Sequence, residues 1–181
     1  MRPFVMLSML LALAVSLPAQ ETVAPSAAAT ASGNPEDVKT LDAIIAALYD
    51  VISGPAGERD WARFGALFRD GSRLIPTGVD SAGRKVTFVW TPEQYAERAG
   101  RWFAENAFYE REAGRVVEQY GQIAHVFSTY ESRRDPGAEP FVRGINSIQL
   151  FHDGSRWWII SIFWGDERSA GPVPARYLPR N

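Results

Sequence analysis

The sequence lacks several residue types on which whole classes of protein depend. It has no cysteine, so a disulfide framework, a thiolate nucleophile and a cysteine-ligated zinc or iron–sulfur site are all excluded. Its two histidines, His125 and His152, are too few for a histidine-rich metal site, and we expect no metal and no cofactor. Lysine occurs only at Lys39 and Lys85, and the net charge of -2 argues against a nucleic-acid partner.

What the chain does contain is an ordinary globular composition behind an export signal. Its 181 residues are 46% hydrophobic and 22% charged, which excludes a disordered or fibrous protein. Arg2 precedes an apolar run over residues 4–15, the layout of a signal peptide, here residues 1–19. We therefore expect a periplasmic or secreted protein that does not stay in the membrane. The alternative is an uncleaved N-terminal membrane anchor, because Leu17 is large for the cleavage site.

The rest of the chain divides into three parts. Residues 20–34 are small and polar without apolar periodicity, and we interpret them as a flexible linker. Residues 35–168 contain the periodic segments and form the predicted domain. Residues 169–181 form a proline-rich C-terminal tail.

Three helices are predicted in the N-terminal half of this domain. Apolar residues recur every three or four positions over residues 35–53, and a second, shorter helix begins after Asp60 and ends at residues 70–71. The third helix begins at Thr91, where Thr91 and Gln94 form a capping box around a proline, and runs to about residue 106.

Most of the remaining chain is typical of β-strands. The predicted strands are residues 72–76, 85–90, 108–120, 123–133, 141–152 and 155–164, separated by turn-forming residues. Helices in one half and a long antiparallel run in the other predict an α+β fold.

Two stretches carry a family resemblance: YGQIAHVFSTYESRR at residues 120–134 and RGINSIQLFHDGSRWWIISIFWGDER at residues 143–168. With the element order over residues 36–167, they resemble the NTF2-like superfamily, which includes SnoaL-like and ketosteroid-isomerase-like proteins, and within it a group of exported bacterial proteins. The resemblance implies a cone in which three helices pack on a strongly curved, mainly antiparallel sheet of about six strands around an apolar pocket. It does not settle function, because members range from isomerases and cyclases to binding proteins. No motif places the catalytic residues of ketosteroid isomerase on this chain.

A two-residue turn at Asp153-Gly154 would set the register of the last two strands. It would place Leu150 opposite Trp157 and Asn146 opposite Ser161. The other face would then carry Trp158, Ile160, Ile162 and Trp164, and an apolar patch of that size is typically covered. We expect this outer face to form a homodimer. The alternatives are that the tail folds back over it, or that a longer turn exchanges the two faces.

Two sets of titratable residues are candidates for acid–base chemistry. A two-residue turn at Gly121-Gln122 would place His125 opposite Glu118, and a neighbouring carboxylate raises the basicity of an imidazole. His125 is therefore the candidate catalytic residue, although a structural hydrogen-bonded histidine fits the pattern as well. Glu110 and Glu112 share one strand face, either as paired acids or as solvated partners of arginines.

Four residues are candidates for contact with a ligand. Asn146 and Ser161 are neutral polar groups on a largely apolar face, as ligand pockets tend to have, although they could equally form a satisfied pair in the core. Tyr49 and Trp102 are aromatic residues of the helices that either line the pocket or belong to the core.

Three functions are consistent with these patterns. The first is binding of a small hydrophobic ligand in the cone. The second is an isomerase, hydratase or cyclase with His125 as its acid or base. The third is an interaction module without a pocket, which a cone filled by its own aromatic residues would favour.

Overall fold

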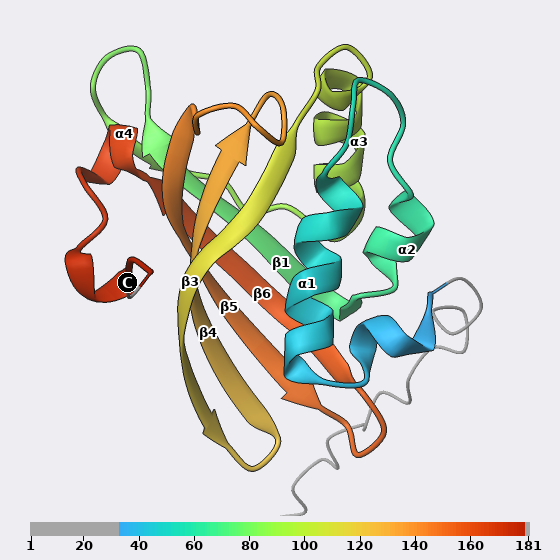
Figure 1. The fold of residues 1–181 in the computed structure, drawn as a ribbon. Helices are drawn as coiled ribbons and strands as arrows, with labels where there is room; N and C mark the ends of the chain where they lie inside the picture. The colour runs from blue at the N-terminus through green and yellow to red at the C-terminus, as the bar shows by residue number, and fades with distance from the viewer. Residues whose placement is uncertain (1–32, 180–181) are drawn as a thin grey trace, which may run out of the picture.

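The computed structural model describes residues 33–179, so the predicted signal peptide and nearly all of the predicted linker lie outside the described residues. A six-stranded sheet curls around one side of the helices (Figure 1). The elements in chain order are η2 (Pro35–Val38), α1 (Leu41–Ile52), α2 (Trp61–Gly65), β1 (Phe68–Val79), β2 (Lys85–Thr87), α3 (Pro92–Phe103), β3 (Tyr109–Tyr120), β4 (Ile123–Arg133), β5 (Val142–His152), β6 (Trp157–Asp166), α4 (Glu167–Ala170) and η3 (Ala175–Tyr177). Among the described helices, none has the length and apolar character needed to cross a membrane.

The strands follow the order β2-β1-β6-β5-β4-β3, and every pairing is antiparallel except that of β1 with β6. This confirms the predicted α+β fold with a curved, mainly antiparallel sheet. The second helix is shorter than predicted and ends at Gly65. The chain leaves the helix there because Phe68 already pairs with Ile159 of β6.

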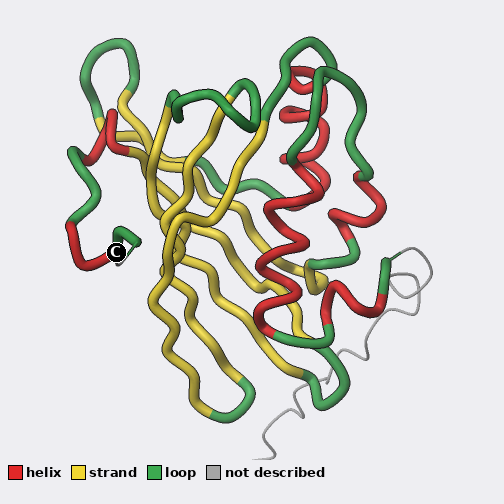
Figure 2. The backbone as a smooth tube through the Cα atoms, in the orientation of Figure 1, coloured by secondary structure: helices red, strands yellow, loops and turns green. Residues whose placement is uncertain are grey.

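The helices cover the inner face of the sheet (Figure 2). Thr40 caps the N-terminus of helix α1, where its hydroxyl accepts a hydrogen bond from the Ala43 amide, and the helix buries Ile44, Ile45 and Leu48. The capping box of Thr91 and Gln94 is present at the start of α3, as predicted. The buried face of α1 also carries Leu48 and Tyr49, which point toward the interior of the cone.

The register of β5 and β6 differs from the prediction. The side chain of Asp153 accepts hydrogen bonds from the amides of Ser155 and Arg156, at 2.8 and 3.0 Å, so the chain makes a longer turn. Leu150 consequently lies opposite Ile159 instead of Trp157.

A β-bulge at Ile160 then shifts the register a second time, because Leu150 pairs with Ile159 while Gln149 pairs with Ser161. Beyond this bulge, Ile162 and Trp164 face the inside of the cone, and Ser161 and Phe163 face outward. The predictions that Ser161 lies beside Asn146, and that Ile162 and Trp164 belong to the outer face, are therefore wrong.

The C-terminal tail lies on the outer face of the sheet, on the side away from α1 and α3 (Figure 1). The hydroxyl of Thr129 donates to the carbonyl of Tyr177 at 2.7 Å, and the Tyr177 ring packs on Phe127. This is the alternative covering that the sequence allowed. Phe163 and Ile160 are still 49% and 36% exposed, and the homodimer stays a prediction.

Candidate functional site

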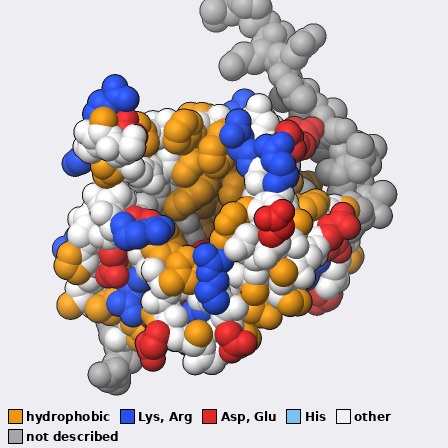
Figure 3. Space-filling model, turned by 90° about the horizontal axis from the view of Figure 1, so that it is seen from above, with side chains coloured by type: hydrophobic (Ala, Val, Ile, Leu, Met, Phe, Trp, Pro, Cys, Tyr) orange, Lys and Arg blue, Asp and Glu red, His pale blue; other side chains and the backbone are white. Residues whose placement is uncertain are grey.

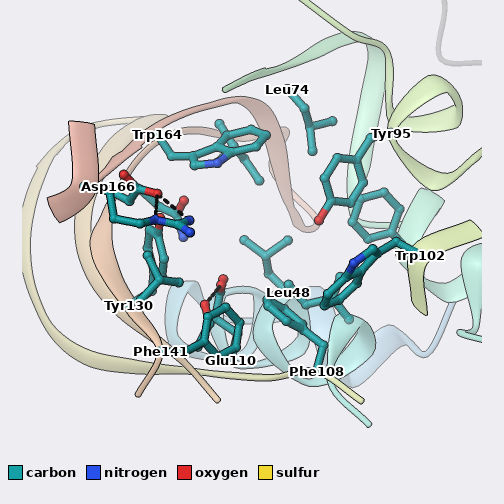
Figure 4. A pocket seen from close by; sticks show the side chains of 17 residues that line it. Leu48, Leu74, Tyr95, Trp102, Phe108, Glu110, Tyr130, Phe141, Trp164 and Asp166 are labelled. Carbon is teal, nitrogen blue, oxygen red and sulfur yellow. Dashed lines mark hydrogen bonds and ion pairs between the residues drawn. The ribbon is translucent and has the colours of Figure 1, made fainter. Parts of the chain in front are cut away.

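A cavity of about 250 Å³ lies between the helices and the inner face of the sheet. Its mouth is the hollow with apolar walls in Figure 3, and Figure 4 shows its lining from close by. The lining residues are Leu48, Ile52, Phe64, Leu74, Tyr95, Trp102, Phe108, Glu110, Tyr130, Ser132, Phe141, Val142, Asn146, Ile162, Trp164, Asp166 and Arg168.

Two of the four predicted ligand contacts belong to this cavity. Asn146 and Trp102 line it. Tyr49 lies one layer behind the lining, where its hydroxyl is hydrogen-bonded to Ser128 and to the lining residue Asn146. Ser161 lies outside the pocket, on the outer face of β6.

His125 also lies on the outer face. Its predicted pairing with Glu118 is confirmed, with 3.8 Å between His125 Nδ1 and Glu118 Oε2. The other ring nitrogen, Nε2, is 2.9 Å from the Ser147 hydroxyl. Its neighbours Ala124 and Val126 point inward and are buried. Because side chains alternate along a strand, His125 points away from the cavity and does not reach a ligand there.

Glu110 provides one of the two carboxyl groups that line the pocket. The Ser132 hydroxyl donates to Glu110 Oε2 at 2.6 Å. Burial raises the pKa of Glu110 to about 7, although hydrogen bonds from Ser132 and Asn146 act in the opposite direction. Near neutral pH, this side chain is therefore present in both its protonated and its ionised form.

A directed chain of hydrogen bonds runs behind the pocket. The Ser128 hydroxyl donates its proton to Glu112 Oε1 at 2.6 Å. The contact of 2.7 Å between Tyr49 and Ser128 must then be a donation by Tyr49, because the single Ser128 proton is already used. Tyr49 accepts in turn from Asn146 Nδ2 at 3.1 Å. The chain thus fixes the orientation of the Asn146 amide.

This chain of hydrogen bonds ends at Glu112, whose carboxylate is paired with Arg115. Arg115 Nε lies 3.0 Å from Glu112 Oε2, and Arg115 Nη1 lies 3.0 Å from the exposed Asp42. Glu110 and Glu112 share the inner face, as the sequence predicted, but only Glu110 lines the pocket.

Tyr95 brings a second polar group to the pocket. Its hydroxyl points into the cavity (Figure 4), and within residues 33–179 it has no hydrogen-bond partner. Burial and the charge of Glu110 raise the pKa of Tyr95, so the hydroxyl is a neutral donor at physiological pH.

The mouth of the pocket is built from charged and aromatic groups. Arg168 donates to Asp166 Oδ2 through Nε and Nη2, at 3.0 and 2.8 Å. Burial alone would raise the pKa of Asp166, but Arg168 and the Ser169 contacts lower it below its ordinary value. Across the mouth, the guanidinium of Arg134 lies 4.7 Å from the ring centre of Trp102 and 4.6 Å from that of Phe141.

The part of the chain that the structure describes has no group of three or more acidic or histidine side chains that could hold a metal ion. The pocket residues that the sequence did not suggest include Tyr95, Trp164, Asp166 and Arg168. Tyr95 belongs to the apolar residues that repeat along α3, and such a pattern indicates a position in the core. Trp164 is turned inward by the bulge at Ile160. Asp166 and Arg168 come after the last predicted strand, where no periodic pattern is left.

No protein-family model matches the chain, and no curated protein matches it. Among solved structures, it is similar to a protein of unknown function with a cystatin-like fold from Nostoc punctiforme, with a TM-score of 0.52 and 10% identity over 67% of this chain and 84% of that one. It is also similar to an NTF2-like protein of unknown function from Silicibacter pomeroyi, with a TM-score of 0.47 and 16% identity over 70% and 92% of the two chains. A third, an NTF2-like protein of unknown function from Pseudomonas putida, has a TM-score of 0.48 and 13% identity over 67% and 77%.

These likenesses concern the fold alone. Three helices on a curved, mainly antiparallel sheet make an NTF2-like cone, as the sequence predicted. What the cone does depends on its pocket.

Proposed function

We propose that this protein binds a small, mainly apolar molecule in the pocket of the cone. The observation that carries the proposal is an open cavity of about 250 Å³ that combines an apolar wall with the polar groups of Glu110 and Tyr95. Ligand sites are typically concave and apolar, with a few polar groups that fix the orientation of the ligand. Seven aromatic side chains line the cavity: Phe64, Tyr95, Trp102, Phe108, Tyr130, Phe141 and Trp164.

The cavity argues against an interaction module without a pocket, because the side chains of the cone leave its centre open. We further propose that binding takes place outside the cytoplasm, since residues 1–19 predict export. His125 has no part in this proposal because it faces the other side of the sheet.

A second candidate is an enzyme of the isomerase, hydratase or cyclase kind, with Glu110 in the role that the sequence suggested for His125. A carboxyl group with a pKa of about 7 can both accept and donate a proton near neutral pH. The unpartnered Tyr95 hydroxyl could donate a hydrogen bond to a substrate oxygen. For such an enzyme, Glu110→Gln would abolish turnover while leaving substrate binding within a few-fold.

The binding proposal can be tested with two matched valine substitutions. Val142 lines the pocket, whereas Val116 is exposed on the outer face of β3. Native mass spectrometry of the mature protein, purified from its own host, should detect a small molecule that leaves under denaturing conditions. Titration with a fluorescent apolar dye should show one site.

We expect Val142→Trp to remove both signals by filling the cavity, while Val116→Trp and His125→Ala keep them. If the wild-type protein neither carries a molecule nor binds the dye, or if Val142→Trp binds as the wild type does, the pocket is not a ligand site.

A further inference from the structure

Within the described residues Glu110 has no cationic partner, in contrast to Glu112 and Glu131 of the same sheet. No arginine, lysine or histidine nitrogen lies within 4 Å of it in residues 33–179. Glu112, two residues along the same face, is paired with Arg115. On the outer face, Glu131 contacts three arginines. Arginines are thus paired with Glu112 and Glu131, whereas no basic side chain among the described residues is paired with Glu110.

The second carboxylate of the pocket is neutralised within the protein. Asp166 at the mouth accepts two hydrogen bonds from Arg168. The lining therefore contains two acids and one base, and the surplus negative charge falls on Glu110. A buried carboxylate without a counter-charge is unfavourable, and a ligand that brings the counter-charge would remove this penalty.

The walls of the pocket suit the same kind of ligand. The faces of aromatic rings attract cations, and cages of aromatic side chains are a recurrent way of binding alkylated ammonium groups. Tyr95 and Trp102 come from α3, whereas Trp164 comes from β6, so rings from opposite sides surround the cavity (Figure 4). The chain uses this interaction itself at the mouth, where Arg134 lies against Trp102 and Phe141.

We propose that the pocket takes an amphiphilic amine, whose protonated nitrogen lies against Glu110 and whose apolar part occupies the aromatic cavity. This inference rests on the proposed function and names the class of its ligand. It assigns Glu110 as the group that selects for positive charge, while the apolar wall supplies affinity common to any hydrophobic ligand of similar size.

Protonation of Glu110 should then be coupled to binding. Three tyrosines lie around it: Tyr49 from α1, Tyr95 from α3 and Tyr130 from β4. The charged groups are Glu112, which is paired with Arg115, and the Asp166–Arg168 pair and Arg134 at the mouth. Burial raises the pKa of all three tyrosines, so they stay neutral and leave Glu110 as the group that changes charge near pH 7. An ammonium ligand stabilises its ionised form, so binding releases a proton at a pH where the free pocket is protonated.

Three probes with the same alkyl chain separate charge from hydrophobicity: octylammonium, octanol and octanoate. Calorimetric titration of the mature protein at pH 7.5 should give octylammonium an affinity about tenfold or more above that of octanol, with octanoate the weakest. Glu110→Gln should remove the preference for the amine and keep the affinity for octanol. The matched control is Glu97→Gln, an exposed glutamate of α3, which should bind all three probes as the wild type does.

The pH dependence provides an independent readout. From pH 6 to pH 8 the affinity for octylammonium should rise, and titrations in buffers of different ionisation enthalpy should show proton release at pH 6 that is absent in Glu110→Gln. If octanol binds as tightly as octylammonium in the wild type, the amine is not the ligand class, although the pocket still binds apolar molecules. If none of the probes binds, the proposed function fails together with this inference.

Discussion

Each face of the sheet has a glutamate with little exposure to solvent, and the two glutamates differ in whether arginines surround them. On the outer face, Glu131 is 6% exposed and contacts Arg111, Arg133 and Arg143. On the inner face, Glu110 is surrounded by aromatic rings and has only neutral hydrogen-bond donors. The outer carboxylate is a structural link between three strands, whereas the inner one lines a cavity and has no cationic partner among the described residues. The face alone does not make this difference, because Glu112 also lies on the inner face and is paired with Arg115.

Two isoleucines of β5 allow the test of this comparison for which we expect the largest change in unfolding free energy. Ile148 is fully buried on the inner face, whereas Ile145 is half-buried on the outer face of the same strand. Ile148→Ala should lower the free energy of unfolding by about 3 to 4 kcal/mol, because it creates a cavity in the core. Ile145→Ala should cost about 1 kcal/mol. Urea denaturation of the two variants measures both values, and equal losses would show that the outer face is covered as closely as the inner one.

Removing a hydrogen-bonded hydroxyl should also lower the free energy of unfolding more on the inner face than on the outer face. The difference should be smaller than that between the two isoleucine variants. Tyr49→Phe removes a buried hydroxyl and leaves an Asn146 N–H group and the Ser128 oxygen without a partner. We expect a loss of about 1 to 3 kcal/mol in unfolding free energy. Ser147→Ala breaks the contact with His125, where water can replace the hydroxyl, and should cost about 0.5 kcal/mol. A Tyr49→Phe protein as stable as the wild type would contradict the directed chain.

The pH dependence of stability should also distinguish the two carboxylates, because their contributions have opposite signs. The folded-state pKa of Glu110 is raised from 4.5 to about 7, so its ionisation destabilises the fold as the pH rises from about 4.5 to 7. Burial would also raise the pKa of Glu131, but Arg143, Arg133 and Arg111 lower it to about 2. Its stabilising contribution is therefore complete above pH 4.5 and is lost as the pH falls toward 2.

Urea midpoints measured between pH 3 and pH 7.5 separate the two carboxylates. Glu110→Gln should flatten the curve between pH 5 and 7 and leave its acid limb in place. Glu131→Gln should weaken the acid limb while the decline toward pH 7 persists. Unchanged slopes near neutral pH in Glu110→Gln would mean that Glu110 is solvated in the same way as an ordinary surface glutamate.

Local signals in the sequence predicted the fold and part of the site. The capping box at Thr91 and the pairing of Glu118 with His125 each depend on residues close together in the chain, and both are confirmed. The shared face of Glu110 and Glu112 follows from alternation along one strand.

The register of β5 and β6 could not be predicted in the same way. The Asp153 side chain lengthens the turn, and the bulge at Ile160 shifts the pairing again. No pattern of hydrophobic residues indicates either feature. The turn shifts the pairing by two residues and keeps the faces, whereas the bulge alone decides that Trp164 lines the pocket and Ser161 does not. Tyr95 and Arg168 were missed because only the tertiary fold brings α3 and the end of β6 to one cavity.

Asp166 takes part in both the cap of α4 and the ion pair at the mouth of the pocket, so a change at the mouth should be detectable in the backbone of α4. Its Oδ1 accepts the amide of Ser169 at 3.1 Å and thereby caps α4, while its Oδ2 holds Arg168 at the mouth. Any molecule that draws Asp166 or Arg168 toward itself also changes the first turn of α4. The amide resonance of Ser169, and its rate of hydrogen exchange, should therefore register an occupied pocket from a backbone position that no ligand needs to touch.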